Sequence, residues 1–366
     1  RPQVQTMVNS NSGQPMTPEQ LYAANVDACV GITVSTTMTN IFGYTSTSAA
    51  SGSGFVITAD GYIVTNYHVI EDAVKDSSVS ITVSFHDGSS YPATLVGGEE
   101  DNDVAVLKIE ASGLQTVTLG DSDQLKVGQA VMAIGNPLGE LTYSLTDGLI
   151  SALDRLITTG SGNDSTTMNM LQTNCAINPG NSGGPLFNSY GEVIGITTAK
   201  YSTSSSGTNV EGLGFAIPIN DVKNIISDLI QYGYVTGKPY MGITGVTMSA
   251  SVAQQYGVTN AVLGVYVATV EDGSCSAKAG LQPGDIITAM DEDDVVTFQD
   301  LEAAKATHQA GDTVTLTVFR NGEKLELSLT LDEQPRETVT DTSSQQQQQP
   351  QQNNQYYGWP FGGFFS

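Results

Sequence analysis

The chain has few basic residues. It carries 13 lysines and arginines against 38 aspartates and glutamates in 366 residues, which gives a formal net charge of −25. A protein that binds nucleic acid needs clustered lysine and arginine to neutralise phosphates. The composition therefore argues against nucleic acid as a partner. The excess of acidic residues serves solubility and fits a secreted or cell-envelope protein.

Cysteine is also scarce, with Cys29, Cys175 and Cys275 alone. The number is odd, and the spacing matches neither a disulfide framework nor a metal-binding motif. We expect three free, partly buried thiols, and the sequence predicts no metal and no cofactor. No apolar run approaches the roughly 18 residues of a membrane-spanning helix.

Only three histidines are present to serve as a catalytic base. His308 lies in a stretch with helical character and is predicted to be solvated. His86 ends an alternating strand before an Asp-Gly turn, which predicts a surface hairpin position. His68 follows two short strands, at 54–58 and 62–65, where a strand gives way to a helical turn. A structural, buried histidine is the alternative there.

Asp103 is the acid best placed to orient such a base. It immediately precedes the apolar run 104–109, whereas the three acids just before it resemble a solvated loop. A buried carboxylate bonded to one ring nitrogen fixes the tautomer of a histidine and stabilises its imidazolium. An aspartate before a strand is otherwise an ordinary turn residue.

The run 178–186, Asn-Pro-Gly-Asn-Ser-Gly-Gly-Pro-Leu, places Ser182 in a glycine-rich turn. Gly180 can adopt backbone angles that are closed to other residues. Such a turn can aim two N–H groups at one point, as an oxyanion hole requires. The alternative is a tight turn that needs glycine for its shape alone. The order His68, Asp103, Ser182 is that of chymotrypsin-type enzymes and differs from subtilisin-like and α/β-hydrolase enzymes.

These segments resemble the HtrA (Deg-type) family of serine endopeptidases. The matching motifs lie at 52–55, 65–69, 103–109, 133–138, 172–173, 176–186 and 212–218. The resemblance implies that His68 acts as general base and then acid, that Asp103 orients it, and that Ser182 is the nucleophile. It also implies an oxyanion hole formed by the backbone of Gly180 and Ser182, with Asn181 beside it.

The same resemblance implies a mainly β fold, a chymotrypsin-like double β-barrel followed by an α+β PDZ domain. Short strands broken by Gly, Asn and Asp turns over 27–219 agree with barrels. The expected divisions are a flexible segment 1–20, a protease domain 21–233, a linker 234–239, a PDZ domain 240–332 and a disordered Gln-rich, aromatic-ended tail 333–366.

Two motifs carry the PDZ resemblance. Residues 277–287, Ala-Lys-Ala-Gly-Leu-Gln-Pro-Gly-Asp-Ile-Ile, form the more specific one. The other motif consists of Tyr240, Met241, Gly242 and Ile243. It implies a loop whose N–H groups hold a peptide C-terminus while the peptide adds a strand to the sheet edge. Four residues of this kind are common in proteins, so this motif alone is weak.

Smaller elements are also predicted. Thr17 with Pro18 begins a short helix, and apolar spacing predicts a helix over 220–232. Long loops are expected within 156–170 and at 201–209. The resemblance places the specificity pocket near 196–199 and its following loops. No charged residue is evident there, so we expect small to medium apolar side chains before the cut.

The chain departs from the family just before the serine turn. The usual run is Thr-Asp-Ala-Ala-Ile, whereas 173–177 read Thr-Asn-Cys-Ala-Ile. Asn174 removes a charge and Cys175 adds a thiol. The triad depends on neither, so loop ordering or substrate preference is where an effect is expected.

The sequence therefore predicts an ATP-independent serine endopeptidase that cleaves unfolded or damaged polypeptides by an acyl-enzyme mechanism. The resemblance adds a homotrimer, a PDZ domain for peptide C-termini, and an extracytoplasmic location with a signal or membrane anchor upstream of Arg1. The alternative is a non-catalytic, chaperone-like binder or PDZ scaffold. A complete triad with an intact glycine turn favours the enzyme.

Overall fold

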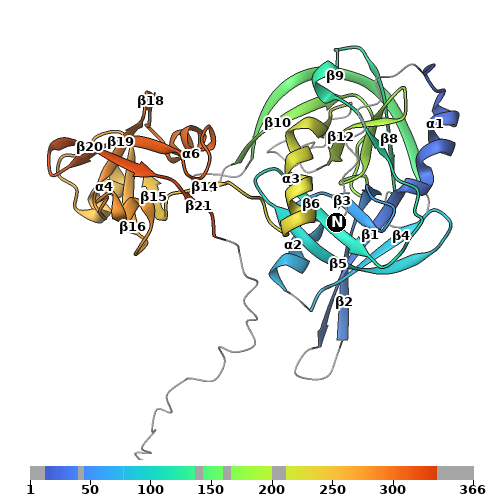
Figure 1. Cartoon of the computed structure of the whole chain (residues 1–366), viewed down its shortest axis with the longest axis horizontal. Coiled ribbons are helices and arrows are strands. Elements are labelled where there is room, and N and C mark those ends of the chain that lie inside the picture. Colours follow the sequence, from blue (N-terminus) through green and yellow to red (C-terminus); the bar gives the residue numbers. More distant parts are fainter. Residues whose placement is uncertain are drawn as a thin grey trace, which may run out of the picture. The chain divides into compact units, whose positions relative to one another are not determined.

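Two closed barrels and a smaller sheet make up the computed structural model (Figure 1). It describes residues 13–39, 45–76, 78–136, 143–159, 166–199 and 212–335. Predictions for 1–12, for the loop 201–209 and for the tail beyond 335 lie outside the described residues.

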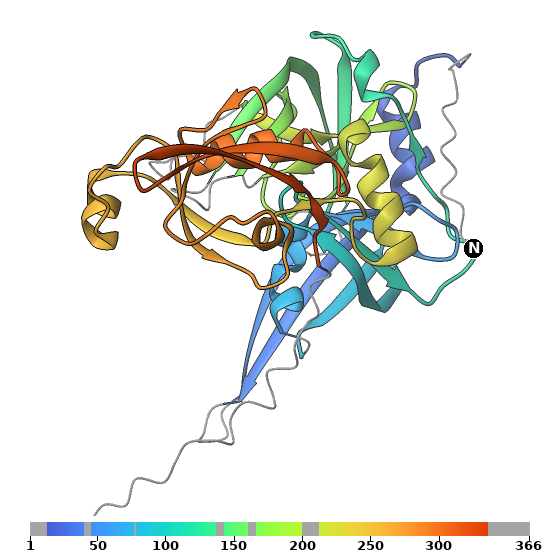
Figure 2. The ribbon, with the colours of Figure 1, turned by 60° about the vertical axis from the view of Figure 1, so that its left-hand side comes forward.

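The first barrel has the strand order β1-β2-β3-β6-β5-β4. Its interior is apolar, with Ile32, Ile63 and Leu107 at most 1% exposed. In both ribbon views, β1 and β2 continue as a hairpin beyond the rest of this barrel (Figures 1 and 2). Its strands are β1 Cys29–Thr39, β2 Thr45–Val56, β3 Tyr62–Thr65, β4 Ser80–Phe85, β5 Ser90–Glu99 and β6 Val104–Ile109.

The second barrel has the order β11-β8-β9-β10-β13-β12, closed by pairing of β11 with β12, and β7 extends it beside β12. Phe55 and Val64 of the first barrel join Met132 and Phe187 of the second in one buried cluster. The barrels therefore share a core at their junction. The strands are β7 Thr118–Leu119, β8 Ala130–Gly135, β9 Ser144–Thr159, β10 Thr166–Thr173, β11 Pro185–Asn188, β12 Glu192–Thr198 and β13 Gly214–Pro218.

Helices flank the barrels. Helix α1 (Pro18–Asn25) begins with the predicted cap at Thr17, whose side chain and that of Gln20 form a capping box. Helix α2 (Tyr67–Lys75) follows β3, and α3 (Ile219–Tyr232) buries an apolar face that includes Val222, Ile226 and Leu229, which confirms the predicted helix. Two short 3₁₀ helices are η1 (Val26–Ala28) and η2 (Ser122–Gln124).

The C-terminal part is a separate sheet of order β15-β16-β17-β19-β20, with β18 beside β17 and a small pair β14–β21. Its own core includes Val267, Met290 and Leu316. Its strands are β14 Pro239–Tyr240, β15 Ile243–Thr247, β16 Val265–Val270, β17 Ile286–Met290, β18 Asp293–Asp294, β19 Thr313–Arg320, β20 Glu323–Thr330 and β21 Asp332–Glu333, and its helices are α4 Ala250–Tyr256, α5 Cys275–Lys278 and α6 Phe298–Ala306.

Three local predictions are wrong. Residue 16 already bonds to Ser189, so ordered structure begins inside the segment 1–20 that we expected to be flexible. Strands β9 and β10 extend to Thr159 and from Thr166, which shortens the loop expected over 156–170. His308 lies beyond the end of α6 at Ala306 and is not helical.

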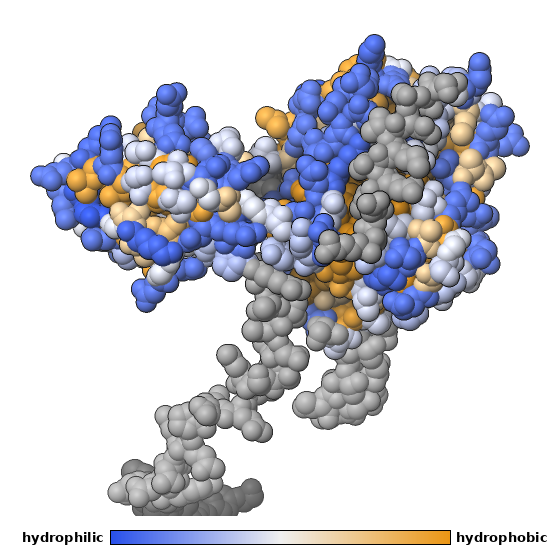
Figure 3. Space-filling view, in the orientation of Figure 1, coloured by the Kyte–Doolittle hydropathy of each residue, from blue (hydrophilic) through white to orange (hydrophobic). Residues whose placement is uncertain are grey.

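Hydrophilic residues are interspersed with neutral and hydrophobic ones over the described part of the visible face (Figure 3). Among the residues that the structure describes, no helix is long and apolar enough to span a membrane.

Candidate active site

His68 lies in the first turn of α2, just after β3, and is in contact with Asp103. Its ring Nδ1 is 2.8 and 2.9 Å from the two carboxylate oxygens, and its backbone N–H donates to Oδ1 at 2.9 Å. The side chain of Asp103 is 2% exposed and that of His68 is 20% exposed. The carboxylate is thus buried while the imidazole reaches the surface, so Nε2 is left for a reacting group.

Asp103 is held in an uncommon backbone conformation. Its φ is +50°, which costs a non-glycine residue about 1 kcal/mol or more. The Asn66 amide donates to the Asp103 carbonyl at 2.9 Å, and the Asp103 N–H donates to Glu100 at 3.0 Å. Asn66 is fully buried. These contacts fix the strained residue so that its carboxylate faces His68.

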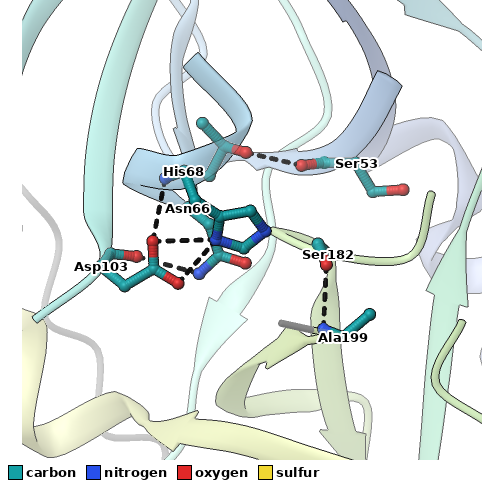
Figure 4. Close-up of polar contacts among 7 residues, drawn as sticks. Ser53, Asn66, His68, Asp103, Ser182 and Ala199 are labelled. Carbon is teal, nitrogen blue, oxygen red and sulfur yellow. Dashed lines mark hydrogen bonds and ion pairs between the residues drawn. The ribbon is translucent and has the colours of Figure 1, made fainter. Parts of the chain in front are cut away.

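Ser182 comes from the second barrel, in the turn before β11. In the view of Figure 4 the imidazole of His68 lies between Asp103 and Ser182. The Ser182 hydroxyl oxygen accepts from the N–H of Ala199 at 2.9 Å. In the described part of the chain no hydrogen bond joins Ser182 to His68. The structure therefore brings the three predicted residues to one place but shows only the His68–Asp103 bond.

The turn at 180–183 leaves two backbone donors open. Gly180 has φ of +98° and Gly183 of +85°, and a Cβ on Gly183 would lie 2.3 Å from the Ser53 carbonyl. Within the described residues, neither the Gly180 N–H nor the Ser182 N–H donates to an acceptor. The Asn181 N–H instead donates to Asn178 at 2.9 Å. Asn181, predicted beside the hole, thus has its backbone donor engaged within the turn.

The two residues that depart from the family pattern are part of the same region. The Asn174 side-chain oxygen accepts from the N–H of Leu149 at 2.7 Å. Cys175 is buried, and its thiol contacts the Thr146 carbonyl at 3.3 Å. Burial raises the pKa of the Cys175 thiol above its ordinary value. Both side chains therefore connect the segment that precedes the serine turn to β9.

Comparison with known proteins places this geometry in a family. A pattern described as "Trypsin-like peptidase domain" matches 52–196, and "PDZ domain" matches 239–331. The "Serine protease Do-like HtrA" of Lactobacillus helveticus is 40% identical over 293 residues, which are 77% of this chain and 68% of that protein. The protein of the same name from Lactococcus lactis subsp. cremoris is 39% identical over 324 residues, 83% and 78% of the two chains.

The chain belongs to the HtrA family of serine proteases. A "Probable periplasmic serine endoprotease DegP-like" from Chlamydia trachomatis is 40% identical over 289 residues, 79% of this chain and 55% of that one. The solved structure "HtrA-type protease AlgW with decapeptide" superposes with a TM-score of 0.63 at 29% identity, covering 88% of this chain and 100% of that chain. The comparisons favour a serine endopeptidase over the non-catalytic alternative.

The PDZ domain of this HtrA protein contains a second candidate site, for peptides. Tyr240 lies in β14 and Ile243 begins β15, so Met241 and Gly242 form the connection. Gly242 has φ of +66°, and a Cβ there would lie 2.4 Å from Ser274. In the described part, the N–H groups of Met241 and Gly242 donate to no acceptor. Such open donors at a strand start can hold a carboxylate.

The Tyr240 side chain is fixed beside this connection. Its hydroxyl donates to Glu271 at 2.6 Å, and that bond, followed by burial, raises the pKa of Tyr240 to about 12. The phenol thus stays protonated at physiological pH. Elsewhere, in the ranges that the structure describes, no cluster of three or more His, Cys, Asp and Glu side chains could hold a metal ion.

Sequence reasoning missed three contacts at the active site. Asn66 and Ser53, whose hydroxyl donates to the Gly180 carbonyl at 2.6 Å, belong to motifs that the resemblance includes, yet the motifs assign them no role. The Ala199 N–H that binds Ser182 has no signal in the sequence, because any residue supplies a backbone N–H. A polar side chain within or next to an apolar strand is the sequence signal that marks Ser53 and Asn66.

Proposed function

We propose that His68, Asp103 and Ser182 form the catalytic triad of this HtrA protease. Ser182 attacks the peptide carbonyl, His68 takes its proton and later gives it to the leaving amine, and water then releases the acyl-enzyme. The observation that supports this most strongly is the bond of His68 Nδ1 to both oxygens of a buried Asp103. That bond presents Nε2 as the acceptor.

The backbone N–H groups of Gly180 and Ser182 are proposed to bind the oxyanion. They are the open donors of the turn, and they flank the hydroxyl that would attack. Each well-placed donor in such a hole is worth about 10²- to 10³-fold in rate. Asn181 contributes by spacing the two donors rather than by its own N–H.

The hydroxyl of Ser182 must turn before it reacts. In this structure it accepts from the Ala199 N–H and makes no bond to His68 among the described residues. Catalytic hydrogen bonds in free enzymes are often long and tighten only with substrate bound. Rotation about χ1 would carry the oxygen from Ala199 toward His68.

Unfolded or damaged polypeptides outside the cytoplasm are the proposed substrates. Several relatives are named as periplasmic proteases, which supports an extracytoplasmic site of action. Cleavage after small to medium apolar side chains, a homotrimer and an upstream membrane tether belong to the same proposal. So do the domain limits 21–233 for the protease, 234–239 for the linker and 240–332 for the PDZ domain.

The PDZ domain is proposed to bind peptide C-termini through Met241 and Gly242, with Tyr240 and Ile243 at the two ends of the loop. The open N–H groups at this connection would receive the carboxylate, while the peptide pairs with the edge strand β15. This would deliver substrates or activators to the protease.

Hydrolysis of unfolded casein, alone and with added peptides that carry free C-termini, tests the proposed activity. Wild type should release acid-soluble fragments and Ser182→Ala should release none above background. If both forms cleave equally, or if wild type cleaves under no peptide condition, the proposal fails.

A further inference from the structure

Two buried hydroxyls, one from each barrel, hold the turn that carries Ser182. Ser53 belongs to β2 and Thr197 to β12, and each is 1% exposed. Both contact backbone carbonyls within 180–184, and neither contacts His68 or Asp103 through a hydrogen bond in the described part. Among the described residues, they differ from the triad in that they contact the backbone of the turn and not the His68 or Asp103 side chains.

Ser53 contacts the turn with both its backbone and its side chain. Its hydroxyl donates to the Gly180 carbonyl at 2.6 Å, and its N–H donates to the Ser182 carbonyl at 2.8 Å. The Asn136 N–H donates to the same hydroxyl oxygen at 2.9 Å. Because that oxygen already accepts from Asn136, its single proton is directed to Gly180.

Thr197 forms hydrogen bonds with the backbone of the residues that flank Ser182. Its hydroxyl donates to the Asn181 carbonyl at 2.6 Å, the shorter of two contacts, since the Gly184 carbonyl lies 3.1 Å from the same hydroxyl. The Gly184 N–H also donates to the Asn181 carbonyl, at 3.0 Å. The Thr197 N–H donates to Gly184 at 2.9 Å, and the Thr197 carbonyl accepts from Gly183 at 2.8 Å. The side-chain bond is therefore added to a backbone pairing that would remain if the hydroxyl were removed.

The peptide bond is planar and trans, so fixing a carbonyl also fixes the N–H on the opposite edge of the same plane. The Asn181 carbonyl shares its plane with the Ser182 N–H, and Thr197 holds that carbonyl. The Gly180 carbonyl and the Asn181 N–H lie in one peptide plane. The Ser53 hydroxyl donates to that carbonyl, and the N–H donates to the Asn178 carbonyl, so both sides of the plane are fixed. Only φ and ψ of Gly180 then decide where the Gly180 N–H points.

We propose that Ser53 and Thr197 are positioning residues that preorganise the oxyanion hole, Thr197 by orienting the Ser182 N–H and Ser53 by fixing the plane that follows Gly180. Stabilisation of the oxyanion depends on donors that need no reorientation during the reaction. The inference rests on the proposed role of Ser182 and adds two residues that touch no substrate.

Four variants test it, with steady-state cleavage of a peptide p-nitroanilide that the wild type hydrolyses. Thr197→Val and Ser53→Ala each remove one hydroxyl, and kcat should fall by about 10- to 100-fold, somewhat less than for loss of a donor itself. KM should stay within about twofold, since ground-state binding does not use the hole. Thr197→Ser keeps the hydroxyl and should retain kcat within about threefold.

Ser122→Ala is the matched control, because it removes a buried hydroxyl that accepts from the Asn220 N–H, away from the turn. It should keep wild-type kcat. A peptide boronate, whose adduct places an oxygen where the oxyanion forms, should lose affinity for Thr197→Val and Ser53→Ala in proportion to kcat. Thermal unfolding of every variant accompanies the kinetics.

The inference is overturned if Thr197→Val and Ser53→Ala keep wild-type kcat, if Thr197→Ser loses as much as Thr197→Val, or if every loss follows the thermal midpoint. Ser182→Ala is measured in the same series. Should it cleave as well as wild type, the proposed function itself fails. If Ser182→Ala is inactive while Thr197→Val and Ser53→Ala keep wild-type kcat, the proposed function stands and only the role of the two hydroxyls is rejected.

Discussion

The buried carboxylate of Asp103 accepts from both the backbone N–H and the ring of His68, so one side chain fixes the position and the tautomer of the histidine. Asp103→Asn keeps the shape but replaces an acceptor-only carboxylate with a group that has an N–H donor. We expect kcat to fall by about 10⁴-fold, with KM little changed. Steady-state peptide hydrolysis checks this.

Asp60→Asn is the control for that change, because Asp60 lies exposed in the turn between β2 and β3. It should behave as wild type. A kcat for Asp103→Asn within tenfold of wild type would contradict the role given to Asp103.

Arg320 and Asp285 form the main buried ion pair of the PDZ domain. Nε and the second guanidinium nitrogen are 2.6 and 2.7 Å from the two oxygens of Asp285, which is 1% exposed. Arg320→Ala leaves that carboxylate buried without its cation, and in the described part of the chain only the Gln282 N–H, which donates to it at 2.9 Å, remains as a partner. We expect a loss of about 3 kcal/mol in unfolding free energy, the lower end for a broken buried pair because Arg320 is one-quarter exposed.

Urea unfolding followed by circular dichroism measures this loss, with Lys324→Ala on the exposed side of β20 as control. Equal stability of the two variants would show that the pair is not important for the fold.

The three thiols should be unreactive in the native protein. Cys29, Cys175 and Cys275 are free and buried, and burial raises the pKa of each. Since thiolate is the reactive form, iodoacetamide at pH 8 should label none of them natively and all three after unfolding. Rapid native labelling, followed by mass spectrometry, would contradict this.

The same shifts make stability depend on pH. An unfolded thiol ionises near pH 8.5, whereas the folded thiols ionise higher, so the unfolded state binds fewer protons above that pH. Stability should therefore fall as pH rises from about 8.5 through the folded pKa values. Serine at all three positions should reduce that slope.

Replacing Asn174 with the aspartate of the family pattern should leave the stability of the protein unchanged. Its side-chain oxygen accepts from Leu149, and a carboxylate can accept the same N–H. Asn174→Asp should therefore keep the unfolding free energy within about 0.5 kcal/mol, while Asn174→Ala should lose about 1 kcal/mol. Thermal unfolding distinguishes them, and an Asp variant as unstable as the Ala variant would contradict the explanation.

Much of the fold could be predicted because turn residues and apolar spacing mark it directly. The cap at Thr17 and the helix ending at Tyr232 follow from local pattern, and the short strands between turns agree with the barrels that the family resemblance implies. The lengths of β9 and β10 could not be predicted, because the threonines at the end of β9 and the start of β10 border a Ser-, Thr- and Gly-rich run in the sequence and only strand pairing extends the two strands. The helical position expected for His308 is wrong for a different reason, since no residue near it signals that the helix ends at Ala306.

At the site, residue types that carry chemistry were evident, and residues that position them were not. The glycine-rich turn indicated Ser182, and His68 and Asp103 could be paired with it because a base needs an acid and the three residues follow the chain order of chymotrypsin-type enzymes. The contacts of Ser53, Asn66, Thr197 and Ala199 depend on two barrels meeting, which no local pattern encodes.

Reaction with a peptide phosphonate and mass mapping of the adduct test the central claim most directly. The account predicts one adduct, on the tryptic peptide that contains Ser182, lost in Ser182→Ala and slowed in Asp103→Asn. An adduct on another residue, or casein hydrolysis by wild type that survives complete phosphonate labelling of Ser182, would contradict the claim that this serine is the nucleophile.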